Sequence, residues 1–103
     1  MKRSLAISTA ILSCGLATTA LATGNIQAGK AKSGACITCH GKQGISSTPD
    51  YPNIAGQTEF YLVKSLREFR SSLRKDPSMN RLAKELSDAD IADLSAYYAS
   101  LRR

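Results

Sequence analysis

Apolar residues recur at helical spacing in the second half of the chain. Four of them follow one another at intervals of four, three and four residues, which places them on one face of a helix: Leu62, Leu66, Phe69 and Leu73. This helix is expected to begin at Gln57 or Thr58. Its opposite face would be basic and carry Lys64, Arg67, Arg70, Arg74 and Lys75.

Two further helices are predicted from their start signals. Asn25 is a suitable cap for a first helix that runs from Ile26 toward Cys36. Ser87 is a suitable cap for a last helix, whose acidic first turn matches the positive end of the helix dipole. The inner face of this last helix is expected to contain Ile91, Leu94, Tyr97 or Tyr98, and Leu101.

The segment between the first helix and the long one has the composition of a loop. Gly41, Gly44, Pro49 and Pro52 interrupt any helical period there. No pair of strands, internal repeat or second domain is evident, so the chain is predicted to be all-α.

The first 22 residues have the three-part pattern of a secretory signal peptide. Lys2 and Arg3 precede a mostly apolar stretch, and Ala20-Leu21-Ala22 forms a small-residue cleavage site. Serines and threonines interrupt the apolar stretch, which makes it a poor membrane span. We expect cleavage after Ala22, export to the periplasm of a Gram-negative cell, and a single domain over residues 23–103 with no transmembrane span. An uncleaved anchor is the alternative.

The net charge bears on the kind of partner, and the chain length bears on the size of the core. The 103 residues include 14 basic and 8 acidic ones, a formal net charge of +6, or +4 without Lys2 and Arg3. Seven basic residues against two acidic ones lie between Lys64 and Lys84, a segment that either steers an acidic partner or is the solvated face of a helix. A domain of about 80 residues has only a thin core of its own, so a bound group is expected to fill part of the interior.

Cys36 and Cys39 are separated by two residues, and His40, the only histidine, follows at once. A thioredoxin-like dithiol would need a βαβ context, and a zinc site would need a fourth ligand. Covalent haem attachment needs neither, because two thiols three positions apart on a helical turn meet two vinyl groups while the adjacent imidazole reaches the iron. Haem attachment is therefore the favoured interpretation, and the haem would supply the missing core.

Met79 is the candidate for the sixth iron ligand. Apart from Met1 it is the only methionine, and it lies in a polar stretch with Pro77, which we interpret as a loop. A methionine isolated from any apolar period is better explained as a ligand than as packing, and a thioether raises the reduction potential relative to a second imidazole.

Taken together, the motifs resemble those of class I c-type cytochromes, in particular the small bacterial monohaem type that is similar to one domain of the dihaem cytochromes c. The likeness covers roughly residues 25 to 102. It rests on Cys36-Ile37-Thr38-Cys39-His40-Gly41, Pro52-Asn53-Ile54-Ala55-Gly56-Gln57 with Tyr61-Leu62, Met79, and Leu86-Ser87-Asp88-Ala89-Asp90-Ile91 with Tyr97-Tyr98.

The resemblance implies a cytochrome c fold, with three to four main helices and loops around one covalently attached haem c. It implies thioether bonds at Cys36 and Cys39, His40 as proximal iron ligand and Met79 as distal ligand. Pro52 would accept a hydrogen bond from the other ring nitrogen of His40 through its carbonyl group, and Ile54 would pack on the porphyrin. The resemblance also implies that the first helix crosses the last one closely at Gly29, near Tyr97 or Tyr98, and it assigns no residue to the haem propionates.

These expectations favour an electron carrier over an enzyme. A buried iron with two protein ligands suits one-electron transfer between redox partner proteins, one of which would present an acidic docking face. A haem-bearing electron-entry subunit of a larger oxidoreductase is the main alternative. A peroxidase-like or gas-binding protein is less consistent with the sequence, since that chemistry needs an open sixth position. No nucleic-acid partner is expected, because aromatic and basic residues do not alternate as they do in stacking surfaces.

Overall fold

The computed structural model describes residues 2–11, 13, 15 and 24–103, and these contain helices but no strands. The predicted cleavage site at Ala20-Leu21-Ala22, together with Cys14, lies outside the described residues. Residues 2–11 are exposed and have no regular structure. The all-α prediction is confirmed, with five helices in the order α1 (Ile26–Lys32), α2 (Gly34–His40), α3 (Glu59–Arg70), α4 (Pro77–Lys84) and α5 (Asp88–Ser100).

Side-chain caps define where four of the helices begin. The Asn25 side chain accepts the Ala28 amide N–H at the start of α1, and Thr58 does the same for Tyr61 at the start of α3. Ser87 caps α5, as predicted, and it does so in a reciprocal capping box with Asp90. These contacts satisfy amide groups that lack partners within their helices, so the caps position the helix starts.

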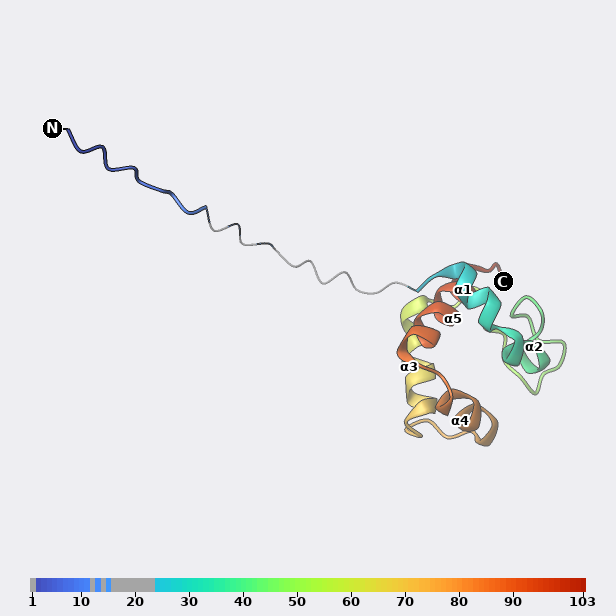
Figure 1. Ribbon diagram of the computed structural model, residues 1–103. Coiled ribbons are helices and arrows are strands. Elements are labelled where there is room, and N and C mark those ends of the chain that lie inside the picture. The colour runs from blue at the N-terminus through green and yellow to red at the C-terminus, as the bar shows by residue number, and fades with distance from the viewer. Residues whose placement is uncertain (1, 12, 14, 16–23) are drawn as a thin grey trace.

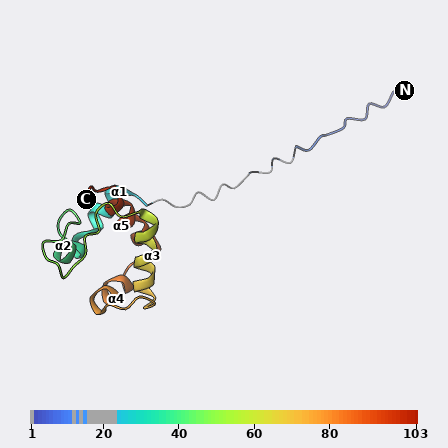
Figure 2. The ribbon, with the colours of Figure 1, turned by 180° about the vertical axis from the view of Figure 1, so that it is seen from behind.

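Helices α1, α3 and α5 form a packed unit that we call the helix hub. Figure 1 shows α1 lying against α5, with α3 on the side of α5 away from α2, and Figure 2 shows the same arrangement from behind. The principal buried cluster joins α3 to α5 and consists of Leu62, Leu94, Tyr97 and Tyr98. Two further segments extend from the hub, and we call them the arms: α2 with the loop over residues 41–57, and α4.

The contact between α1 and α5 depends on Gly29. A Cβ atom added at this position would lie 2.0 Å from the Asp93 carbonyl oxygen and 2.7 Å from the Tyr97 Cβ, closer than any side chain tolerates. The close crossing expected at Gly29 is therefore present. The tyrosine beside it is Tyr97, whereas Tyr98 lies against the loop at Gly44.

A polar clasp joins the same two helices at their surface. The Lys32 ammonium group lies 2.7 Å from one Asp93 carboxylate oxygen and 3.0 Å from Asp90. The Asn25 amide N–H donates to the other Asp93 oxygen at 2.8 Å. Because Asp93 serves both groups, this single carboxylate links both ends of α1 to α5.

The first predicted helix is divided in two. Ser33 interrupts it, and its hydroxyl group donates to the Lys30 carbonyl at 2.7 Å. Serine hydroxyls compete in this way with the backbone ladder, and Gly34 next to it adds no helix propensity. The resulting α2 carries Cys36, Cys39 and His40 on a separate short helix.

Two other predictions near α3 were wrong. Met79 lies in the first turn of α4 rather than in a loop, because Asp76 caps that helix and Pro77 occupies its first position, where proline is favoured. The amphipathic period also ends earlier than expected. Helix α3 stops at Arg70, Ser72 adopts a left-handed conformation with φ 64°, and Leu73 is 76% exposed instead of buried.

The loop between α2 and α3 is held by backbone contacts to its surroundings. Gly41 has φ 85°, and a Cβ there would lie 1.8 Å from the Ile45 carbonyl oxygen, so this turn requires glycine. Further along, the Gly56 N–H donates to the Tyr98 carbonyl at 2.9 Å and ties the loop to the hub. Within the part of the chain that the structure describes, no helix has the length and apolar character needed to cross a bilayer.

Candidate haem site

A cavity of about 430 Å³ lies between the two arms and the inner faces of α3 and α5. This volume is within the ~300–1,000 Å³ range of cofactor sites. All six predicted site residues line it, although they come from three separate segments: Cys36, Cys39, His40, Pro52, Ile54 and Met79.

Helix α2 brings the two thiols to the cavity wall. Cys36 and Cys39 are three positions apart on one helix, both are partly buried, and neither forms a disulfide within the described residues. Burial raises the pKa of the Cys36 thiol. Two unpaired thiols one turn apart are chemically suited to form thioether bonds with two vinyl groups of one macrocycle.

His40 ends α2 and is buried. Its Nδ1 atom lies 2.8 Å from the Pro52 carbonyl oxygen, the contact that the resemblance implied. A carbonyl group only accepts, so Nδ1 is the donor in this contact, and Nε2 is the ring atom left to bind a metal. Pro52 therefore fixes the tautomer and the orientation that an imidazole needs to bind iron.

Met79 reaches the cavity from the other arm. It lies in the first turn of α4, where its amide N–H donates to the Asp76 cap at 2.9 Å, and its side chain is partly buried. Figure 1 shows α2 and α4 as the two opposite arms of the molecule. The cap thus places a soft thioether on the wall that faces the α2 arm.

The wall formed by the hub is mostly apolar but contains two hydroxyl groups. Leu62, Leu66 and Leu94 line it. The hydroxyl groups of Ser95 and Tyr98 also belong to this wall, are fully buried, and have no hydrogen-bond partner among the described residues. Burial raises the pKa of Tyr98, so its phenol is neutral.

These features fit a covalently bound haem. Two thiols, an oriented imidazole and a thioether are the groups that such a haem requires. An apolar wall suits the porphyrin face. Unpartnered buried hydroxyl groups cost about 1–3 kcal/mol each, which is consistent with a wall adapted to a bound group rather than to protein atoms.

Arg74 is a cavity residue that sequence analysis placed elsewhere. The helical period put it on the outer face of α3, but α3 ends at Arg70 and the chain then turns. Its guanidinium group lies 3.3 Å from the Ser65 hydroxyl and 4.6 Å from the centroid of the Phe69 ring, on the cavity wall. The usable signal was Ser71-Ser72, two poor helix formers that end the period before Arg74.

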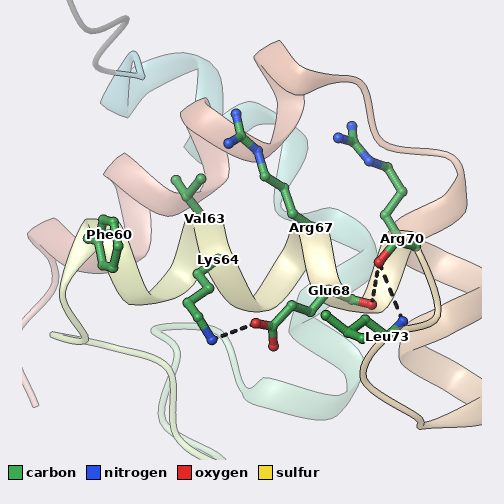
Figure 3. Close-up of a pocket in the computed structure, with 8 residues that line it drawn as sticks. Phe60, Val63, Lys64, Arg67, Glu68, Arg70 and Leu73 are labelled. Carbon is green, nitrogen blue, oxygen red and sulfur yellow. Dashed lines mark hydrogen bonds and ion pairs between the residues drawn. The ribbon is translucent and has the colours of Figure 1, made fainter.

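The outer face of α3 carries a second, shallow pocket of about 540 Å³ (Figure 3). Phe60 and Leu73, at its two ends, are 80% and 76% exposed. Two of its cations are already paired with acidic residues, Lys64 with Glu68 and Arg70 with Asp88. Arg67 is the cation of this pocket that has no ion pair within the described residues.

Comparison with known proteins shows the family of this chain. Residues 26–102 match the family model described as Cytochrome c. The chain is 42% identical over 90 residues to cytochrome c4 of Pseudomonas aeruginosa, a match that covers 87% of this chain and 45% of the relative. It is 44% identical over 80 residues to cytochrome c-554(548) of Halomonas halodenitrificans, covering 75% of this chain and 96% of the relative.

The solved structures agree with the fold. Reduced recombinant cytochrome c4 from Pseudomonas stutzeri superposes with a TM-score of 0.73 at 35% identity, over 77% of this chain and 46% of that chain. The chain thus spans about half the length of the cytochrome c4 relatives that it matches. From the family model, the relatives and the shared fold, the chain belongs to the cytochrome c family, whose cofactor is a covalently bound haem c.

Proposed function

We propose that this protein is a periplasmic electron carrier that accepts and donates one electron through a single haem c. The observation that carries the proposal is the pairing of His40 and Met79 on opposite arms of one cavity. With both axial positions supplied by side chains, no site remains for a substrate at the iron. The relatives named above are also cytochromes, which supports a carrier rather than an enzyme.

Each site residue has a proposed task. Cys36 and Cys39 form the thioether bonds, which prevent dissociation of the cofactor. His40, held by Pro52, is the proximal ligand, and Met79 is the distal one. Ile54, partly buried against the hub cluster, packs on the porphyrin. When bound, the haem supplies reversible one-electron chemistry at its iron, and the protein sets the potential through these ligands and the apolar wall.

Optical spectra test this proposal directly. The mature protein, produced in a host that attaches haem c, is recorded oxidised, reduced, and reduced under carbon monoxide. A c-type reduced spectrum, a ferric sulfur-to-iron band and no response to carbon monoxide are expected. A spectrum that shifts with carbon monoxide would favour the ligand-binding or peroxidase-like alternative. Absence of haem would return the two cysteines to the dithiol hypothesis.

Native size distinguishes a shuttle from a fixed subunit. A free carrier elutes at the mass of one domain, whereas an electron-entry subunit of a larger oxidoreductase co-elutes with its complex. The measurement is size exclusion of a native extract followed by haem absorbance. Because the haem chemistry is the same in both cases, the spectra above do not decide between them.

We further propose that the partner has an acidic docking face that meets the outer face of α3. Support comes from the pocket between Phe60 and Leu73, where two exposed apolar side chains flank Arg67. The internal pairs of Lys64 and Arg70 make this basic surface smaller than the sequence indicated. Exposed cations around an apolar centre favour transient association with anionic surfaces.

Poly-glutamate is a suitable probe of this surface. In an NMR titration, the amide shifts are expected to concentrate on residues 60–73 and to disappear at high salt. Arg67→Glu should weaken the binding several-fold, whereas Lys30→Glu, an exposed charge change on α1, should have little effect. Equal weakening by both variants would indicate a response to net charge alone and would reject the proposed face.

Export is proposed from Lys2, Arg3 and the apolar stretch that follows them. Cleavage after Ala22 leaves Thr23 as the first residue of the mature protein. The intact mass and N-terminal sequence of the periplasmic protein test this. A chain that retains Lys2 in the membrane fraction would favour the anchored alternative.

A further inference from the structure

Arg74 is unusually constrained for a residue outside a helix. Its backbone N–H donates to the Glu68 carbonyl at 3.1 Å, and its carbonyl accepts from the Asn80 side chain at 2.8 Å. The same Asn80 amide group also donates to the Phe69 carbonyl at 2.8 Å, so it joins the end of α3 to the turn that follows. These hydrogen bonds therefore fix the backbone of Arg74 in the segment between α3 and α4.

The side chain of Arg74 is held too, but only by neutral groups. Its Nη1 atom lies 3.3 Å from the Ser65 hydroxyl and 3.5 Å from the Tyr61 hydroxyl. The guanidinium carbon lies 4.6 Å from the centroid of the Phe69 ring, a cation–π contact. A guanidinium group has five N–H donors in a fork that matches a carboxylate, and these contacts engage only one of its nitrogen atoms.

No carboxylate balances this charge within the described residues. Two other cations line the cavity. Lys32 is paired with Asp90 and Asp93, and the Lys75 side chain has neither an ion pair nor a hydrogen bond within the described residues that would hold it in place. Asp76, the nearest acidic residue along the chain, uses a carboxylate oxygen to cap Met79. Arg74 is thus an exposed positive charge that is oriented by neutral groups at the cavity wall and is available to an anion bound in the cavity.

The chemistry of haem supplies such an anion. The macrocycle carries two vinyl groups on one side and two propionate carboxylates on the other. Cys36 and Cys39, which take the vinyl side, belong to the α2 arm. Arg74 follows α3, and α2 and α3 lie on opposite sides of the molecule in both ribbon views (Figures 1 and 2). Arg74 therefore lies across the cavity from the two thiols.

We propose that Arg74 binds a haem propionate, and that Tyr61 and Ser65 are positioning residues that hold its guanidinium group. This inference rests on the proposed covalent attachment at Cys36 and Cys39. A paired Arg74 offsets the negative charge of the carboxylate near the iron. It also excludes protons from that carboxylate over the physiological range, because an adjacent guanidinium group favours the ionised form.

The test is the reduction potential of holoprotein from about pH 5 to about pH 8, measured by spectroelectrochemistry. The wild type should give a nearly flat profile. Arg74→Gln should lower the potential throughout the upper part of this range, because the ferrous state loses a stabilising positive charge, and should add a pH-dependent step. Arg74→Lys, which keeps the charge but not the fork, should give an intermediate profile.

Arg81→Gln is the matched control. It removes the same charge from an exposed position on α4 that does not line the cavity, so its profile should follow the wild type. Should Arg74→Gln fail to mature, Tyr61→Phe and Ser65→Ala decide the question, with smaller shifts in the same direction expected. Profiles of Arg74→Gln, or of these two substitutes, that are indistinguishable from Arg81→Gln would overturn the proposal.

The haem spectrum separates this inference from the function on which it rests. A c-type spectrum in all variants, with no response of the potential to Arg74, rejects only the role of Arg74. A wild-type protein without covalent haem rejects the proposed function itself.

Discussion

The helix hub and the arms differ in what holds them together. Helix α5 has six buried residues: Ile91, Leu94, Ser95, Ala96, Tyr97 and Tyr98. By contrast, α2 buries only His40 and α4 only Ala83. The hub therefore contains most of the protein core, whereas the arms bury few residues and face each other across a cavity. Of the two arms, α4 also packs on α3.

The largest difference between the hub and the arms is expected in the double variant Cys36→Ser with Cys39→Ser. Without thioether bonds the arms lose their common attachment, so we expect no covalent haem and a marked loss of helix from α2 and α4. Haem staining after denaturing electrophoresis and far-UV circular dichroism measure the two effects. Cys14→Ser is the control, and it should retain haem. Covalent haem in the double variant would disprove the attachment site.

The hub itself is weakened most by a side chain at Gly29. Gly29→Ala forces a Cβ within 2.0 Å of the Asp93 carbonyl oxygen, so α1 and α5 must separate. The expected loss is about 3 kcal/mol of unfolding free energy, the upper end for an overpacked site, with an unchanged haem spectrum. Denaturant titration provides the measurement.

Gly34→Ala is a matched control for that substitution. An added Cβ at Gly34 meets nothing within 4 Å, and the position is helical. Alanine there should leave stability unchanged or raise it by up to about 1 kcal/mol. If both glycine variants behave alike, the close crossing is not what holds the hub together.

Met79→Ala removes the proposed iron ligand of the α4 arm and should leave the haem attached. The cofactor should stay attached while the iron becomes open to carbon monoxide and the ferric sulfur-to-iron band disappears. The free energy of unfolding should fall by about 2 kcal/mol, as for a partly buried methionine. Leu82→Ala removes an apolar side chain from the same helix and cavity wall but should stay closed to carbon monoxide. Unchanged ligand binding in Met79→Ala would remove Met79 from the iron.

The smallest effect is expected at the polar clasp. The hydrogen bond from Lys32 and that from the Asn25 backbone hold the pKa of Asp93 below its usual value of 3.8. Because the folded pKa is the lower one, the clasp stabilises the protein fully above about pH 5 and loses this effect as the pH falls through 3.8 and below. Asp93→Asn should thus be slightly less stable than wild type at pH 7, and the difference should shrink toward pH 3. A difference in denaturation midpoint that stays constant with pH would exclude this carboxylate as the cause.

Local signals predicted the hub well. Asn25 and Ser87 were identified as caps because capping depends on side chains within three residues of the helix start. The buried face of α5 followed from its period. The six candidate site residues all line one cavity, and their roles at a haem stay predictions.

The errors lie where the arms begin. Ser33 interrupts the first predicted helix next to Gly34, and its hydroxyl contact to the Lys30 carbonyl is visible only in the structure. The start signal Asp76-Pro77 was overlooked because the polar stretch before Met79 was interpreted as a loop. Met79, Leu82, Ala83 and Leu86 in fact follow it at helical spacing. Arg74 was misplaced by extending a period past a turn whose left-handed Ser72 only the structure reveals.

The clasp between α1 and α5 also has a consequence for the order of events during biosynthesis. Lys32 and Asp93 are 61 residues apart in the chain, so the first helix waits for the last one before the hub closes. Loop closure over such a span is a late and comparatively slow step. Until then the α2 thiols belong to an open chain, and both are accessible before folding encloses the cavity.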